Sequence, residues 1–134
     1  MRGPGLLIAR CNLLLVLALG LAVPALAQEA VSFRQEIQPI LARYCFACHG
    51  PDAEQRQADL RLDQEAAAKV HSIVEGQPDQ SPLIERILSS DATDVMPPPE
   101  TGHVLTDNEK DLLRRWVAEG ARYQSHWAFD QIQR

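Results

Sequence analysis

The sequence predicts a small helical domain that follows a short apolar leader. Apolar residues recur at helical spacing in three separate stretches, and capping residues mark where these stretches begin or end. Residues 60–63 alternate between apolar and charged, but four residues are too few to indicate a strand. The chain has 134 residues, which is enough for one domain after the leader is removed.

Residues 1–27 are typical of an export signal. Basic residues open the segment, an apolar run spans 13–23, and residues 25–27 read Ala-Leu-Ala, a small-x-small cleavage pattern. A spanning helix needs about 20 apolar residues, so the run is short for one. An uncleaved anchor is the alternative, and it is the one route to a membrane. Cys11 precedes the apolar run and does not resemble a lipid-attachment site. We therefore expect an exported protein, periplasmic or in the cell envelope.

The chain beyond the signal is acidic. It keeps 11 Lys and Arg against 18 Asp and Glu, a formal charge of −7. Binding to nucleic acid or to an anionic membrane surface calls for clustered basic residues, so neither is expected. A basic partner protein would suit this charge, and a solvated acidic surface without a partner is the alternative.

The domain is expected over residues 28–122, and its first helix starts near Ser32. Ser32 is a candidate N-cap, with Gln35 as the reciprocal partner. Pro39 either kinks this helix or restarts it with the proline in a first turn. The apolar face comprises Phe33, Ile37, Ile40, Leu41 and Tyr44.

Two short helices are expected in the middle of the domain. One lies within 64–74 and ends before Gly76. The other starts at Ser81-Pro82, where a cap is followed by proline. The apolar face of the second consists of Leu83, Ile84, Ile87 and Leu88.

The last helix has the clearest boundaries. Thr106 and Glu109 form a capping box, and Gly120 ends the helix. An apolar stripe along this helix should pack against the first helix, although Trp116 could instead shield the edge of a cofactor. The stripe consists of Leu112, Leu113, Trp116 and Val117. Residues 123–134 lack a cap and are interpreted as a tail or as the start of a further region.

Residues 45–49 read Cys-Phe-Ala-Cys-His, the attachment motif for a c-type haem. On a helical turn, residues three apart share a face, so both thiols can reach the vinyl groups of one haem. His49 follows as the proximal iron ligand. We therefore predict one covalent haem c held by Cys45, Cys48 and His49.

Other interpretations of this motif are weaker. A thioredoxin-like redox pair needs strand-helix-strand surroundings, and none are predicted. A structural zinc site needs four ligands, and no second pair stands at zinc spacing. A disulfide between Cys45 and Cys48 would leave His49 unexplained.

Met96 is the candidate for the distal ligand. It is the only methionine beyond the signal, and it opens a Met-Pro-Pro-Pro segment that should stiffen an extended loop. A thioether is a soft, neutral ligand that favours ferrous iron. The alternatives are a core role for Met96 and ligation by His71, His103 or His126.

An ordered series of motifs runs through the chain, and it resembles the planctomycete-type cytochrome c domain. The series comprises Phe33, Pro39-Ile40-Leu41, 45–50, 60–63, Gly76-x-Pro78-x-x-Ser81-x-Leu83, Met96-Pro97-Pro98, Trp116 to Ala121, and His126-Trp127-Ala128-Phe129. The resemblance implies the all-α cytochrome c fold, with His49 proximal and Met96 distal. It also implies electron transfer and a longer exported protein whose downstream domains are missing here.

The resulting hypothesis is an electron carrier that exchanges electrons with a redox partner protein and is not itself an enzyme. One alternative is the haem module of a larger exported oxidoreductase. Another is a peroxidase-like enzyme, which would need an open iron site and an acid–base residue, for which His103 is the candidate. A haem-based sensor would require a gas ligand to replace Met96.

Overall fold

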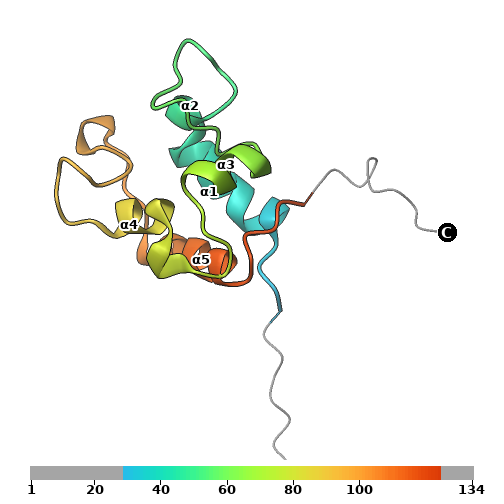
Figure 1. The fold of residues 1–134 in the computed structure, drawn as a ribbon. Helices are drawn as coiled ribbons and strands as arrows, with labels where there is room; N and C mark the ends of the chain where they lie inside the picture. The colour runs from blue at the N-terminus through green and yellow to red at the C-terminus, as the bar shows by residue number, and fades with distance from the viewer. Residues whose placement is uncertain (1–28, 125–134) are drawn as a thin grey trace, which may run out of the picture.

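The computed structural model describes residues 29–124 and is helical, with no strand in that range (Figure 1). The all-α prediction is therefore confirmed. The predicted signal, His126 and the last ten residues lie outside the described residues. The elements in chain order are η1 (Phe33–Ile37), α1 (Gln38–Tyr44), α2 (Phe46–His49), α3 (Glu65–His71), η2 (Pro78–Gln80), α4 (Pro82–Leu88), η3 (Pro99–Thr101) and α5 (Asp107–Ala118).

The first helix restarts at Pro39. Five residues form the π-helical turn η1, and α1 then begins with Pro39 in its first turn, where a missing N–H costs nothing. Ser32 caps η1 by accepting from the Gln35 N–H at 3.4 Å. The reciprocal bond, however, comes from Glu36, whose Oε2 accepts from the Ser32 N–H at 2.8 Å. The prediction of Gln35 was wrong because the wider π turn brings the fourth residue, and not the third, over the cap.

Ser81 precedes α4 as predicted, but its side chain does not cap the helix. The hydroxyl accepts from the Val74 N–H at 2.9 Å and lies 3.0 Å from the Gln77 carbonyl oxygen. Ser81 therefore braces the connection between α3 and α4. Leu88 was also predicted wrongly. It is 50% exposed because it ends the helix where the chain leads away from α5 (Figure 1).

Helix α5 has the predicted capping box between Thr106 and Glu109. The elements η1, η2 and α4 all pack against it. Trp116 is 1% exposed and packs against both Phe33 and Tyr123, with ring centroids 5.7 Å and 5.2 Å away. The predicted packing of the last helix on the first is therefore confirmed.

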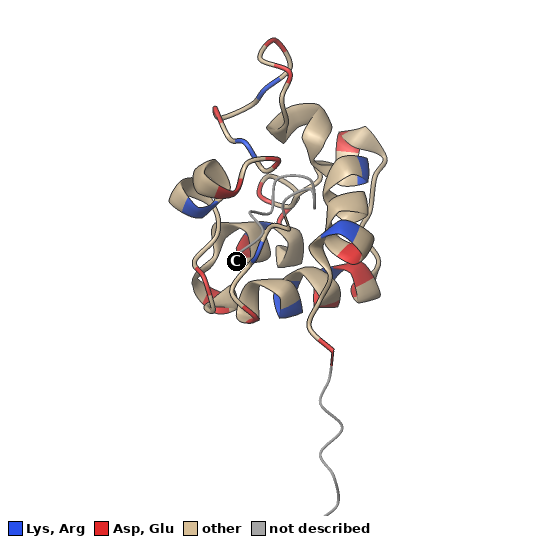
Figure 2. Ribbon diagram, turned by 90° about the vertical axis from the view of Figure 1, so that its right-hand side faces the viewer, with Lys and Arg blue, Asp and Glu red and all other residues tan. Residues whose placement is uncertain are grey.

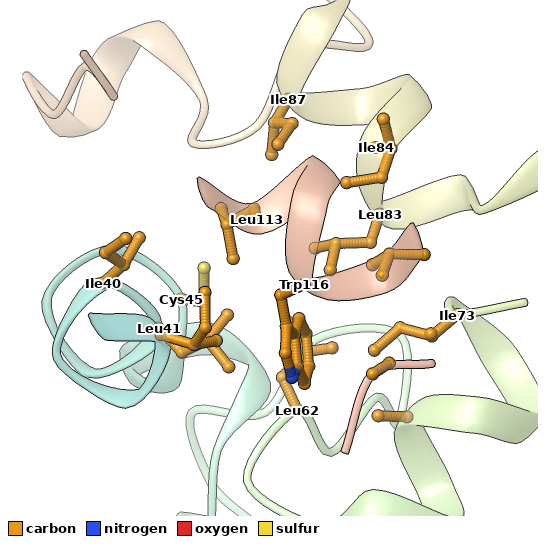
Figure 3. Packing of buried hydrophobic residues seen from close by; sticks show 14 of the residues in the cluster. Ile40, Leu41, Cys45, Leu62, Ile73, Leu83, Ile84, Ile87, Leu113 and Trp116 are labelled. Carbon is orange, nitrogen blue, oxygen red and sulfur yellow. The ribbon is translucent and has the colours of Figure 1, made fainter. Parts of the chain in front are cut away.

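One continuous apolar core joins these elements (Figure 3). It draws residues from η1, α1, α3, α4 and α5 and from the loops between them. In the view of Figure 2, basic positions are scattered singly among acidic and uncharged ones. Among residues 29–124, no helix is long and apolar enough to cross a bilayer.

Candidate functional site

The Cys-x-x-Cys-His motif forms a helical turn at the junction of α1 and α2. Cys45 caps α2, and its carbonyl accepts from the N–H groups of Cys48 and His49 at 3.2 and 2.7 Å. Both cysteines are free thiols. Because they stand three residues apart on this turn, both thiols belong to one side of it.

The two thiols differ in environment. Cys45 is buried among core residues and lies beside Ile40 and Leu41 in Figure 3, whereas Cys48 is exposed. Burial, reinforced by Cys48, raises the pKa of the Cys45 thiol from 9.0 to about 12. Cys45 is therefore a neutral thiol at physiological pH, in the form that packs in an apolar core.

The surroundings of His49 favour one tautomer of its ring. Its ring is half-buried, and Nδ1 lies 3.3 Å from the carbonyl oxygen of Gln57. A carbonyl only accepts, so Nδ1 carries the proton and Nε2 keeps a free lone pair. Burial lowers the pKa of His49, and the bond to Gln57 opposes this only in part. A neutral imidazole oriented through its other nitrogen is the form that binds iron.

The chain reverses sharply after His49 because Gly50 lies against the preceding helix. A Cβ on Gly50 would lie 2.2 Å from the carbonyl oxygen of Phe46. Residues 56–62 then return to the motif, and we call this segment the strap. The N–H groups of Gln57 and Leu62 donate to the carbonyls of Cys48 and His49 at 2.7 and 2.8 Å.

The strap was not predicted from the sequence, although residues 60–63 stood out by their alternation. Its backbone bonds to the motif leave no trace in hydrophobic periodicity. The one available signal was Leu62, the second apolar residue of the alternating segment, which is 2% exposed and anchors the strap in the core.

Met96 lies in the connection between α4 and α5. Its N–H donates to the Arg86 carbonyl at 3.0 Å, and its side chain is half-buried. Both this connection and α2 lie above α5 in the view of Figure 1. The prediction of an extended segment from Met96 onward was wrong. The chain bends at Met96 and Pro97, which are joined by a cis peptide bond, and only Pro98 is extended before Pro99 starts the turn η3.

The alternative histidine ligands have distinct positions. His71 is exposed at the end of α3. His103 is also exposed, but its ring meets the edge of Tyr44 with centroids 6.0 Å apart, which places it beside the residue that precedes Cys45. His126 lies outside the described residues.

The chemistry of these donors fits a covalently held haem. Two free thiols share one helical turn, a neutral imidazole keeps Nε2 available, and a half-buried thioether lies in an anchored loop. Within residues 29–124, no three His, Cys, Asp or Glu side chains gather as a metal site would require. The donor set therefore fits haem.

Residues 45–100 match the family model described as Planctomycete cytochrome C. The match begins at Cys45 and includes the motif, the strap, α3, α4 and Met96, and it confirms the resemblance seen in the sequence. Searches of curated proteins and of solved structures found no match. The family match indicates a haem-binding electron-transfer module of a kind that is generally exported.

Proposed function

We propose that this planctomycete-type cytochrome c domain transfers single electrons through one haem c, with His49 and Met96 as axial ligands. Thioether bonds from Cys45 and Cys48 would hold the group covalently. The observation that supports this most strongly is the hydrogen bond from His49 Nδ1 to the Gln57 carbonyl, which prepares Nε2 for iron.

The cysteines and His49 have separate tasks in this proposal. Cys45 fixes one attachment point within the core, and exposed Cys48 supplies the other. His49 donates its Nε2 lone pair while Gln57 holds the ring. When bound, the haem supplies a one-electron ferric/ferrous couple.

Met96 would set the potential of the site. Its thioether is neutral and soft, so it stabilises ferrous iron and raises the reduction potential. The backbone bond to Arg86 anchors the loop at Met96 itself. The Arg86 side chain holds the same loop through the Asp94 carboxylate at 2.8 Å, so little further ordering is needed for ligation.

When the protein fills both axial positions of the haem iron, no coordination site is open to a substrate. It would act as a carrier, either alone or as the haem module of a larger exported oxidoreductase. The peroxidase-like alternative requires an open site. One observation favours histidine ligation as the competing arrangement, namely the contact of His103 with Tyr44 beside the motif.

The test is to produce the protein in an exporting host with haem-attachment machinery and to record the absorption spectrum of the ferric form. We expect a low-spin haem with the weak far-red band of sulfur–iron ligation. A low-spin spectrum without that band would indicate a histidine ligand, and a high-spin spectrum an open site. Either result would overturn ligation by Met96.

The variant Met96→Ala should keep the haem attached but lose the far-red band and have a lower reduction potential. Val95→Ala is the control, because Val95 is a half-buried neighbour in the same loop and offers no ligand. An unchanged potential in Met96→Ala would contradict the assignment.

The net charge and the leader support a proposal for the partner and the location. We propose that residues 1–27 direct export to the periplasm or cell envelope. The formal charge of −7 beyond that segment suits a basic redox partner. Raising the salt concentration should then slow electron exchange with a basic protein.

A further inference from the structure

Arg56 joins the strap to the point where the chain leaves the haem motif. Its Nε donates to the Gly50 carbonyl at 3.1 Å, and its Nη2 donates to the Pro51 carbonyl at 3.1 Å. Nη1 pairs with Asp59 at 3.3 Å. The Arg56 side chain is 17% exposed, whereas Asp59 is 95% exposed. Two of the three bonds of the guanidinium therefore go to backbone carbonyls, and the third is an ion pair with an exposed carboxylate, which contributes little.

The residue after Arg56 is the one that holds His49. Gln57 bonds to the motif twice, through its N–H to the Cys48 carbonyl at 2.7 Å and through its carbonyl to His49 Nδ1 at 3.3 Å. The position of the Gln57 peptide therefore decides how well the imidazole is held. Arg56 fixes that peptide from one side.

A strained turn fixes the same peptide from the other side. The Leu60 N–H donates to the Gln57 carbonyl at 3.2 Å, and the two residues between them, Ala58 and Asp59, have φ angles of 53° and 50°. This is the pattern of a type I′ turn, which normally has glycine, asparagine or aspartate at such positions, so Ala58 is the strained residue. Strain of this kind persists only where the surroundings enforce it, and it gathers at functional sites.

We propose that Arg56 is a positioning residue for the proximal ligand, acting through the Gln57 carbonyl. Its two bonds to Gly50 and Pro51 hold the strap against the motif, and the 57–60 turn directs the carbonyl at Nδ1. This inference rests on the proposed function, because it concerns His49 as an iron ligand.

The physical consequence is an effect on redox potential. An Nδ1–H that donates to a firmly held carbonyl makes Nε2 a stronger donor, and a stronger donor stabilises ferric iron. Loosening the strap should weaken that bond and raise the reduction potential. The sign is opposite to that expected for Met96→Ala, so the two effects are distinguishable.

The test compares the haem-loaded protein with Arg56→Ala, measuring the midpoint potential and the solvent exchange of the His49 Nδ1 proton by NMR. We expect both thioether bonds and the low-spin spectrum to remain, the potential to rise, and the proton to exchange faster. Arg56→Lys keeps the charge but not the forked pair of donors. Its potential and its exchange rate should therefore lie between those of the wild type and those of Arg56→Ala.

Arg114→Ala is the matched control for charge. Arg114 is also paired with one aspartate, Asp79, but its side chain is 50% exposed on α5. The potential and the exchange rate should stay at the wild-type values in this variant. An Arg56→Ala protein that matches the wild type in both would overturn the positioning role.

A second variant covers the case in which Arg56→Ala does not fold. Ala58→Val adds a β-branched side chain at an exposed position with positive φ, so it acts only through the turn. It should raise the potential, whereas Ala66→Val at an exposed position of α3 should not. Equal potentials in the two valine variants would contradict the proposal. Wild-type protein that takes up no haem would instead overturn the proposed function itself.

Discussion

At the residue scale, close backbone contacts determine what surrounds the motif. Gly50 is the clearest case, because its backbone passes so close to Phe46 that no side chain fits. Its φ is −125°, so the requirement for glycine comes from space and not from a left-handed conformation. The haem motif therefore extends by one residue, to Gly50.

We predict that Gly50→Ala destabilises the protein by about 1–3 kcal/mol, the typical cost of overpacking. It should also disturb the haem spectrum, because the Gly50 carbonyl and the turn must shift. Denaturant unfolding and the absorption spectrum are the measurements.

Gly102→Ala is the control for this prediction. Gly102 has a φ of 69°, but a Cβ added there would have nothing within 4 Å. Only the strain of the left-handed backbone should lower the unfolding free energy at this position, by about 1–2 kcal/mol. The haem spectrum should not change. A normal spectrum for Gly50→Ala would show that the turn adapts without cost to the site.

At the element scale, short helices gain their stability from caps and from one packed face. α5 has both, with a capping box at Thr106 and three buried residues along its stripe. α4 has a packed face but no side-chain cap, since the Ser81 hydroxyl bonds to the preceding loop. The two helices should therefore respond differently to substitutions at their N-termini.

Replacing the cap of α5 gives a direct measurement. Thr106→Ala removes the hydroxyl that accepts from the Glu109 N–H at 3.3 Å, and we expect a loss of about 1 kcal/mol in unfolding free energy. Thr106→Ser keeps the acceptor and should retain most of the stability. Equal urea midpoints for the alanine and serine variants would contradict a capping role.

The packed face of α4 offers a comparison between adjacent residues. Ile87 is 1% exposed and Leu88 is 50% exposed. Ile87→Ala should therefore lower the unfolding free energy by about 2–5 kcal/mol, and Leu88→Ala should change it by no more than about 0.5 kcal/mol. Thermal and denaturant unfolding of the two variants measure this difference between the buried and the exposed face. Similar losses would mean that Leu88 is covered in solution.

At the scale of the whole molecule, the end of the described chain closes the fold on the motif. Tyr123 packs on Phe33 with centroids 4.4 Å apart, and its hydroxyl donates to the Leu62 carbonyl at 2.9 Å. Leu62 in turn donates to the His49 carbonyl. Tyr123 is partly buried and packs against the core, and it links the C-terminal segment to the strap.

This link predicts how stability depends on pH. Burial, reinforced by nearby acidic groups, raises the pKa of Tyr123 above its ordinary value. The folded state therefore keeps the proton longer than the unfolded state, and stability falls as the pH rises above about 10. In the haem-loaded protein, Tyr123→Phe should have an unfolding free energy about 1 kcal/mol lower than the wild type at neutral pH. Its unfolding free energy should then fall less at alkaline pH. Parallel pH profiles for the two proteins would contradict this.

The sequence by itself determined the all-α class, the position of α5 with its capping box, and the attachment motif. These features depend on local spacing, and hydrogen bonds within one or two turns enforce them. The family match then confirmed the resemblance. Assignment of Met96 rests on composition and loop chemistry, and it remains a prediction for the spectrum to test.

Only the tertiary structure decided which groups surround the motif. Gln57 holds His49 through its own backbone carbonyl, which every residue possesses. The side chains of Arg56 and Tyr123 donate to carbonyls of other segments, and the sequence does not show which carbonyls these are. Likewise, the exposure of Leu88, the use of Glu36 at the first cap and the role of Ser81 depend on where neighbouring segments lie. Periodicity predicts which face of a helix is apolar, but packing decides how much of that face is covered.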